Sequence, residues 1–195
     1  PGKSERTMAL MAHYDSATVE ADENGQQSIT AGTSHGAADD GYGVAAIVEA
    51  LRAIKAEGRQ PENSLKIVIT DGEEIGLVGA RNEMRYHRAD YENVDLVLNL
   101  EARGMSGPAL MFETSSNNSA VAGYFLSHVK QPVTGSLLPS LYARIPNSTD
   151  MTAVIPEGFT VLNIAAIGEA DHYHHATDAP RYVDHSTLQH YGDQV

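Results

Sequence analysis

Histidine and carboxylate side chains gather just after several strand-like segments and just before one helical segment of this chain. They are His13 and Asp15, Asp39 and Asp40, Asp71, Glu73 and Glu74, Glu101, and Glu169, Asp171, His172, His174 and His175. Imidazole and carboxylate groups are the ligands that borderline or hard divalent cations such as zinc prefer. The chain has no cysteine, so a metal site has to use these groups. Two such ions about 3.5–4 Å apart share a carboxylate, polarise a carbonyl group and lower the pKa of a water molecule.

A hydrolytic centre of this kind also needs a carboxylate that stays free to take a proton from the attacking water. The adjacent Glu73 and Glu74 can divide this work, because neighbouring residues in a turn point in different directions. Each group alone also has an ordinary interpretation. Asp39 and Asp40 can cap the following helix, Glu73 and Glu74 can complement the dipole of the next one, and His13 can be a hydrogen-bonded residue at a strand end. Their coincidence at four strands and one helix start favours a metal centre.

The segments that carry these residues alternate between strand and helix patterns. Strand-like runs cover 6–12, 65–70, 94–100, 108–113 and 160–167, and helical patterns cover 43–57, 75–87, 119–129 and the residues from 186 onwards. This alternation predicts an α/β fold, a three-layer α/β/α sandwich around a mixed, mostly parallel sheet. Such a sheet binds ligands beyond the carboxyl ends of its strands, where the candidate ligands lie. Residues 20–38, rich in polar residues and glycine, predict a long surface loop.

Length and charge narrow the class of protein. The 195 residues suit one domain with one core. The net charge of -13, without a cluster of Lys or Arg, argues against a nucleic-acid partner. No apolar run reaches the roughly 18 residues that span a bilayer, so a membrane is expected to be involved only through segments outside this chain. Because a strand pattern follows Pro1 so closely, we expect a domain from a longer chain, with its C-terminal helix truncated at Val195.

Six motifs together resemble the co-catalytic zinc aminopeptidase family, metallopeptidase family twenty-eight. They are MAHYDS (11–16), GAADDGYGVA (36–45), DGEEIGLVGA (71–80), LNLEARG (98–104), IPNSTDMT (145–152) and DHYHHATDAP (171–180). They occur in the family's order over nearly the whole chain, and the combination is specific although no single motif is. LNLEARG, ALMFET and IPNSTD are most similar to the membrane-anchored vacuolar and endoplasmic-reticulum branch. The resemblance implies a zinc-exopeptidase-like fold, one catalytic domain over 1–195, two Zn²⁺ ions and a peptide substrate.

The resemblance also implies a set of metal ligands. Asp39 would bridge the two zinc ions, His13 and Glu101 would complete one site, and Glu74 and His174 the other. The family has Tyr before this last histidine and an acid four residues after it. His174 meets both conditions, whereas the neighbouring His175 meets neither.

The remaining implied roles concern catalysis and support. Glu73 would be the general base and then the acid for the leaving amine, and Tyr173 would donate a hydrogen bond to the oxyanion. Asp15 would orient the ring of the first histidine ligand. Asp40 and Asp150 would support the site, and the peptide bond before Asp40 is expected to be cis.

Several alternatives stay open. Arg103 can bind a substrate carboxylate, which would favour carboxypeptidase action, or it can pair with a structural acid. A glutaminyl-cyclase-like acyltransferase would use the same scaffold with one zinc ion and indole side chains, and the lack of tryptophan counts against it. A non-catalytic, receptor-like relative would have lost ligands, whereas all five ligands and the base are present. Most members of the family work outside the cytosol, so an extracytoplasmic location (periplasmic, secreted or lumenal) is expected.

Overall fold

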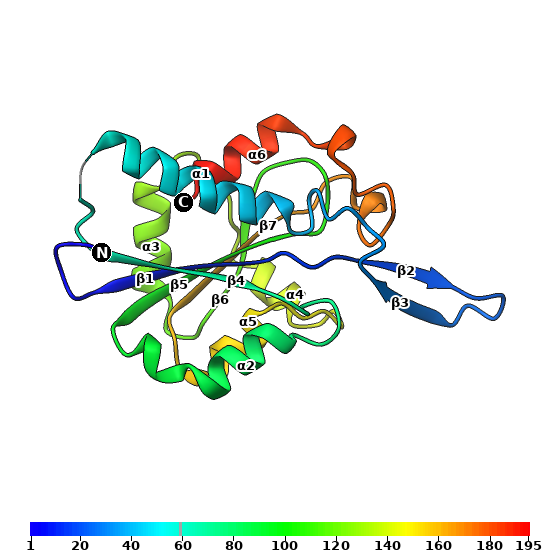
Figure 1. Cartoon of the computed structure of the whole chain (residues 1–195), viewed down its shortest axis with the longest axis horizontal. Helices are drawn as coiled ribbons and strands as arrows, with labels where there is room; N and C mark the ends of the chain where they lie inside the picture. Colours follow the sequence, from blue (N-terminus) through cyan, green and yellow to red (C-terminus); the bar gives the residue numbers. More distant parts are fainter. Residues whose placement is uncertain (59) are drawn as a thin grey trace.

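A five-stranded sheet with the strand order β4-β1-β5-β7-β6 forms the centre of the molecule (Figure 1). The computed structural model describes residues 1–58 and 60–195. The strands of the sheet are β1 (Thr7–His13), β4 (Ser64–Thr70), β5 (Val94–Ala102), β6 (Leu110–Thr114) and β7 (Val161–Ala166). The first four in spatial order, β4, β1, β5 and β7, pair in parallel, and β6 runs antiparallel to β7 at one edge. The predicted mixed, mostly parallel sheet is confirmed.

The central strands are buried on both faces, as their apolar sequences indicate. Side chains alternate between the faces of a strand. In β1, Leu10 and Ala12 therefore belong to one hydrophobic cluster, whereas Ala9 and Met11 belong to the other. Every residue of β7 is buried. The sheet is thus the middle layer between two separate apolar cores.

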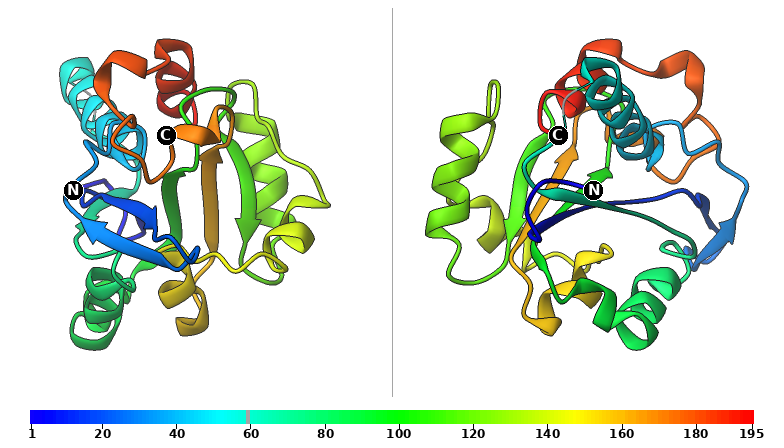
Figure 2. Two further views of the ribbon diagram at one scale, coloured as in Figure 1. Left: turned by 90° about the vertical axis from the view of Figure 1, so that its right-hand side faces the viewer. Right: turned by 60° about the vertical axis from the view of Figure 1, so that its left-hand side comes forward.

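Helices cover both faces of the sheet (Figures 1 and 2). One cluster contains residues of α1 (Gly41–Glu57), α3 (Ser119–His128) and α6 (His185–Gly192), and the other contains residues of α2 (Val78–Tyr86) and α5 (Met151–Val154). The short helix α4 (Leu138–Tyr142) packs on β6. The 3₁₀ turns are η1 (Arg88–Tyr91), η2 (Ile155–Glu157), η3 (Ala170–His172) and η4 (Pro180–Tyr182). Within the two described ranges, no helix combines the length and the apolar character that crossing a membrane requires.

Helix α1 shows how local sequence sets an element that the site depends on. The carboxylate of Asp40 accepts a hydrogen bond from the amide of Gly43 and so caps the first turn. Gly58, with a φ of 67°, takes the left-handed conformation that ends the helix. The start of α1 is therefore fixed beside the aspartates at positions 39 and 40.

The prediction of a loop over residues 20–38 was wrong in part. β2 (Ala17–Ala21) and β3 (Gln27–Ala31) form an antiparallel hairpin that projects away from the sheet (Figure 1). Its turn is held by Asp22, whose Oδ1 accepts the amides of Asn24 and Gln26, each at 2.8 Å. β3 is exposed along its whole length, so it lacks the apolar alternation by which a strand is recognised in a sequence.

Candidate metal centre

The five predicted ligands converge at the carboxyl ends of neighbouring strands. His13 is the last residue of β1, and Glu101 lies near the end of β5, which pairs with β1. Glu74 lies in the turn after β4, the other neighbour of β1. Asp39 lies just before α1, and His174 lies in the loop after β7. Sheet topology thus brings together residues that are up to 161 positions apart (174 - 13).

These side chains form two groups that share Asp39. In the first group, His13 Nε2 lies 3.2 Å from Asp39 Oδ1 and 3.5 Å from Glu101 Oε2. In the second, His174 Nε2 lies 2.7 Å from Glu74 Oε2 and 3.5 Å from Asp39 Oδ2. The ligand atoms of each group all lie within 4.8 Å of one another. Asp39 therefore turns one carboxylate oxygen toward each histidine.

The chemistry of this donor set fits divalent cations. Asp39, Glu74 and Glu101 are buried close together, and burying like charges is costly unless they are paired or bind a metal. Glu74 Oε1 is buried and has no hydrogen-bond partner in the described part of the chain. Imidazole nitrogen and carboxylate oxygen are ligands that suit zinc.

The electrostatics of the metal-free centre show the same excess of negative charge. Burial alone would lower the pKa of His13, but the carboxylates of Asp15, Asp39 and Glu101 outweigh it and raise that pKa well above 6.5. Burial also opposes protonation of His174, but the carboxylates of Asp39 and Glu74 outweigh it and raise the pKa of His174 to about 9. Without a metal ion, the surrounding carboxylates therefore raise the proton affinity of both histidines.

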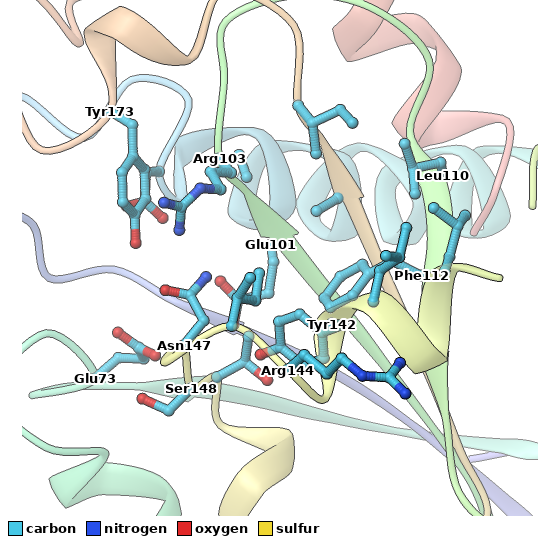
Figure 3. A pocket seen from close by; sticks show the side chains of 18 residues that line it. Glu73, Glu101, Arg103, Leu110, Phe112, Tyr142, Arg144, Asn147, Ser148 and Tyr173 are labelled. Carbon is cyan, nitrogen blue, oxygen red and sulfur yellow. The ribbon is translucent and has the colours of Figure 1, made fainter.

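Glu73 differs from the ligands because it belongs to neither group. It is half-buried and lines a cavity beside them, where Figure 3 shows it facing the same space as Glu101 and Tyr173. Burial, followed by repulsion from Glu101, raises the pKa of Glu73 to about 10, although His13 opposes the shift. A carboxyl group with increased proton affinity beside a candidate metal centre is suited to proton transfer.

Asp15 holds two parts of the centre in place. Its backbone carbonyl accepts a hydrogen bond from His13 Nδ1 at 2.9 Å. With Nδ1 as the donor, Nε2 is the nitrogen that faces the carboxylates of Asp39 and Glu101 and could bind a metal ion. Its carboxylate accepts the backbone amides of Glu73 and Glu74 at 3.1 and 3.2 Å. Burial opposes the ionisation of Asp15, but the His13 side chain and then the amides of Glu73 and Glu74 lower its pKa. One residue therefore orients the histidine ring and the turn that carries both glutamates.

The backbone around Asp39 is fixed from two sides. The carboxylate of Asp178 accepts the amides of Ala38 at 2.7 Å and Asp39 at 3.1 Å. On the other side, Asp40 caps α1 through Gly43. The peptide bond between Asp39 and Asp40 is cis, as the resemblance predicts.

Two buried asparagines behind the centre were not predicted as site residues. Asn99 Nδ2 donates to Glu101 Oε1 and to Asn163 Oδ1, both at 3.0 Å. Asn163 Nδ2 in turn donates to Glu113 Oε2 and to Thr149 Oγ1, both at 2.9 Å. The signal in the sequence is an asparagine within each of two otherwise apolar strands, because such a residue needs buried partners.

Asp150 contacts Thr70, a sheet neighbour of the candidate ligand His13. The hydroxyl of Thr70 donates a hydrogen bond to Asp150 Oδ2. Thr70 ends β4 and pairs in register with His13. Burial and the charge of Glu101 raise the pKa of Asp150 to about 6.

Tyr173 and Arg103 form one side of the cavity beside the centre, which has a volume of about 300 Å³ (Figure 3). The ring of Tyr173 stacks on His174, with 3.7 Å between the centroids, and the guanidinium carbon of Arg103 lies 4.8 Å from the Tyr173 centroid. Burial raises the pKa of Tyr173, so its hydroxyl remains a donor. The side chain of Arg103 is exposed and forms no ion pair with any acid that the structure describes.

Comparison with known proteins decides the family. Residues 1–195 match the model described as Peptidase family M28. The chain belongs to peptidase family M28. This M28 chain is 31% identical over 160 residues to a vacuolar membrane protease of Lodderomyces elongisporus, a match that covers 81% of the chain and 16% of that protein. The chain spans about a sixth of the length of the curated relatives it matches.

Solved structures share the fold of the M28 chain. A Zn-dependent exopeptidase from Parabacteroides distasonis superposes with a TM-score of 0.67 at 17% identity, over 98% of this chain and 72% of that chain. A glutaminyl cyclase of an Acidobacteriales bacterium has a TM-score of 0.66 at 20% identity, over 100% of this chain and 68% of that one. At such identities the likeness shows the fold alone. These structures confirm the predicted zinc-exopeptidase-like fold. The family match and the curated relatives confirm the resemblance to peptidase family M28 and to its vacuolar membrane branch.

Proposed function

We propose that this chain is the catalytic domain of an aminopeptidase that holds two zinc ions. One observation carries the proposal: Asp39 turns one oxygen toward His13 and the other toward His174. Asp39 would bridge the ions, Glu101 would complete the site of the first histidine, and Glu74 that of the second. Zinc bound in such a pair polarises a carbonyl group and lowers the pKa of a water molecule.

Glu73 performs the proton transfers in this proposal. It lines the cavity and is not needed as a ligand in either group, so its carboxylate is free to accept a proton from the attacking water. The same carboxyl group then donates that proton to the nitrogen of the departing amine. The hydroxyl of Tyr173 lies on the other side of the same cavity and donates a hydrogen bond to the oxyanion.

Glu73→Gln tests the general base. Glutamine keeps the shape of the side chain but cannot take up the proton, so we expect kcat to fall about 10²- to 10⁴-fold. Zinc content, measured by elemental analysis, should stay at two ions per chain. Glu92→Gln, at an exposed position away from the cavity, is the matched control. Wild-type kcat in the Glu73 variant would overturn the mechanism, and near-zero zinc after gentle purification would favour a binding domain without catalysis.

Arg103 favours a second candidate function, carboxypeptidase action. Its exposed guanidinium lines the cavity, where it could bind the terminal carboxylate of a peptide. A screen of aminoacyl amides with a free amino group against N-blocked dipeptides, with and without zinc, separates the two activities. If the chain is an aminopeptidase, it should hydrolyse only the aminoacyl amides, and the Arg103→Leu variant should hydrolyse them at the same rate as the wild type. Hydrolysis of the blocked dipeptides, lost in that variant, would establish carboxypeptidase action.

The cellular setting of the proposed enzyme follows its relatives. The curated relatives are named vacuolar membrane proteases. We therefore propose a peptide substrate and an extracytoplasmic site of action, with attachment to a membrane only through segments outside this chain. Fractionation of cells that express the full-length protein, with protease protection of this domain, tests the location. A domain that is digested from the cytosolic side of intact membranes would contradict it.

A further inference from the structure

A buried tyrosine of helix α6 reaches the end of the strand that carries the candidate ligand Glu101. Tyr191 is completely buried. Its hydroxyl donates a hydrogen bond to the backbone carbonyl of Glu101 and accepts one from the amide of Ala166 at 2.6 Å. Packing alone does not require this hydroxyl, because the ring of phenylalanine would fill the same apolar space. The hydroxyl therefore serves the backbone beside the metal centre.

The two partners of this hydroxyl belong to neighbouring strands, β5 and β7, which pair in parallel. At the end of this ladder, the amide of Arg103 donates to the carbonyl of Ala166. The donors of a parallel ladder alternate between its two strands, so the amide of Ala166 faces the carbonyl of Glu101. The hydroxyl of Tyr191 therefore enters the ladder at the candidate ligand itself.

Helix α6 is held independently of the candidate ligands, so it can support this contact. Thr187 Oγ1 donates to the carbonyl of Gly107 at 2.9 Å, and His190 Nδ1 accepts the amide of Ala109 at 3.0 Å. These contacts tie α6 to the segment that follows β5. The helix also packs against α1 (Figure 1). Tyr191 thus joins the backbone of the ligand strand to a fixed helix.

Glu101 is held at both its backbone and its carboxylate. Asn99 donates to Oε1 of the carboxylate, whereas Tyr191 donates to the backbone carbonyl. The other carboxylate oxygen, Oε2, faces His13 Nε2 at 3.5 Å. A glutamate side chain loses rotamer freedom when it binds a metal ion, and anchors formed beforehand reduce that cost. The backbone anchor therefore contributes to the affinity of this site.

We infer that Tyr191 is a positioning residue of the metal centre, because its hydroxyl fixes the backbone of Glu101 and so strengthens metal binding by His13 and Glu101. The inference rests on the proposed function, which places a zinc ion at this site. Tyr191 belongs to neither ligand group and does not line the cavity, so it acts only through Glu101. Metal binding by Glu74 and His174 should not depend on this hydroxyl.

Tyr42 of α1 offers a matched control. It is also buried, and its hydroxyl also bridges two backbone groups, donating to the carbonyl of Met105 at 2.7 Å and accepting the amide of Asp184 at 2.9 Å. Its ring packs against that of Tyr191, with 5.3 Å between the centroids. Tyr42→Phe thus removes a similar pair of hydrogen bonds without touching a candidate ligand. Both Tyr→Phe variants should lower the Tm of the metal-free chain by about 2–4 °C.

A zinc titration followed by nitrogen NMR of the imidazole rings tests the inference, because each histidine reports its own site. A competing chelator sets the free zinc concentration. In Tyr191→Phe the affinity at His13 should fall about tenfold, the lower end of the effect of groups that orient metal ligands. The affinity at His174 should stay unchanged, as should both affinities in Tyr42→Phe. An unchanged affinity at His13, an equal loss at both histidines, or the same loss in Tyr42→Phe overturns the inference.

Hydrogen exchange provides a readout without metal. The amide of Ala166 loses its acceptor in Tyr191→Phe, so in the metal-free chain it should exchange at least about tenfold faster than in the wild type or in Tyr42→Phe. If Tyr191→Phe does not fold, the wild-type chain serves instead. Its buried Tyr191 hydroxyl proton should then change resonance frequency when zinc binds at His13, and a constant frequency overturns the inference.

These measurements separate failure of the inference from failure of the proposed function. If the wild type binds zinc but hydrolyses no aminoacyl amide, aminopeptidase action fails, and the titration still decides the role of Tyr191. If the wild type binds no zinc at either histidine, the proposed function fails, and amide exchange decides whether the hydroxyl fixes the backbone of Glu101. Equal exchange of the Ala166 amide in Tyr191→Phe and Tyr42→Phe then overturns the positioning role.

Discussion

Replacing Asp150 by asparagine is expected to stabilise the metal-free protein at neutral pH. Asp150 is completely buried just before α5. The Thr70 hydroxyl donates to its Oδ2, but its Oδ1 has no hydrogen-bond partner in residues 1–58 and 60–195. Asparagine keeps the shape of the side chain and an acceptor for Thr70, and it carries no charge. The variant therefore removes a buried charge while it retains the packing.

The size of the effect follows from the pKa of this carboxyl group. Burial and the charge of Glu101 raise the pKa of Asp150 from 3.8 to about 6. Because the folded protein binds this proton more tightly than the unfolded chain, Asp150 does not destabilise the fold below about pH 4. The loss of stability grows between about pH 4 and pH 6 and then levels off, so that at pH 8 it amounts to about 3 kcal/mol. Asp150→Asn should recover that amount.

Urea unfolding at pH 4, 6 and 8, after removal of metal with a chelator, measures this difference. The free energy of unfolding of the variant relative to the wild type should rise from near zero at pH 4 to about 3 kcal/mol at pH 8. Asp171→Asn, at an exposed position, should show no such trend. Zinc should reduce the gain, since nearby positive charge favours the ionised carboxylate. A pH-independent difference, or a less stable variant at pH 8, would refute the electrostatic argument.

Four further predictions concern a contact behind the centre, two glycines and the metal. Asn99→Leu removes the donor that holds Glu101, so zinc affinity measured by competition calorimetry should fall about 10- to 100-fold; unchanged affinity would exclude an orienting role. Gly104→Ala would place a Cβ 2.1 Å from the carbonyl oxygen of Gly168 and should lower the free energy of unfolding by about 1–3 kcal/mol. Gly123→Ala, where a Cβ meets nothing within 4 Å, should instead stabilise helix α3 by about 0.5–1 kcal/mol. Removal of metal by a chelator should lower the Tm, because the buried carboxylates lose their counter-charge, and addition of zinc should restore it. An unchanged Tm would contradict a metal-binding centre.

The elements and the candidate ligands could be predicted because both depend on local sequence and on one general rule. Apolar runs define the strands, and ligands of parallel sheets gather at the carboxyl ends of those strands. His13, Glu74 and Glu101 satisfy this rule directly from the order of the segments. The structure brings them together with Asp39 and His174 into the two groups described above.

The contacts around the candidate ligands and the cavity beside them depend on strand register, which the sequence does not specify. Asn99 and Asn163 are 64 positions apart and meet only because β5 and β7 pair in one register. The cavity wall formed by α4 could not be predicted either, since residues 138–142 have too short a pattern to indicate a helix. The hairpin of β2 and β3 was missed for a different reason, because β3 is exposed along its whole length and so lacks the apolar alternation of a half-buried strand.

The antiparallel edge strand explains how a polar centre and an apolar wall come to lie side by side. Four parallel strands end at the same edge of the sheet and supply charged groups there. Because β6 runs in the opposite direction, its first residue, Leu110, lies level with Ala165 near the end of β7. Helix α4 then packs on β6 without contributing to either ligand group. The apolar residues of β6 and α4 and the candidate ligands therefore belong to different elements, so Phe112→Ala on β6 should leave zinc affinity unchanged.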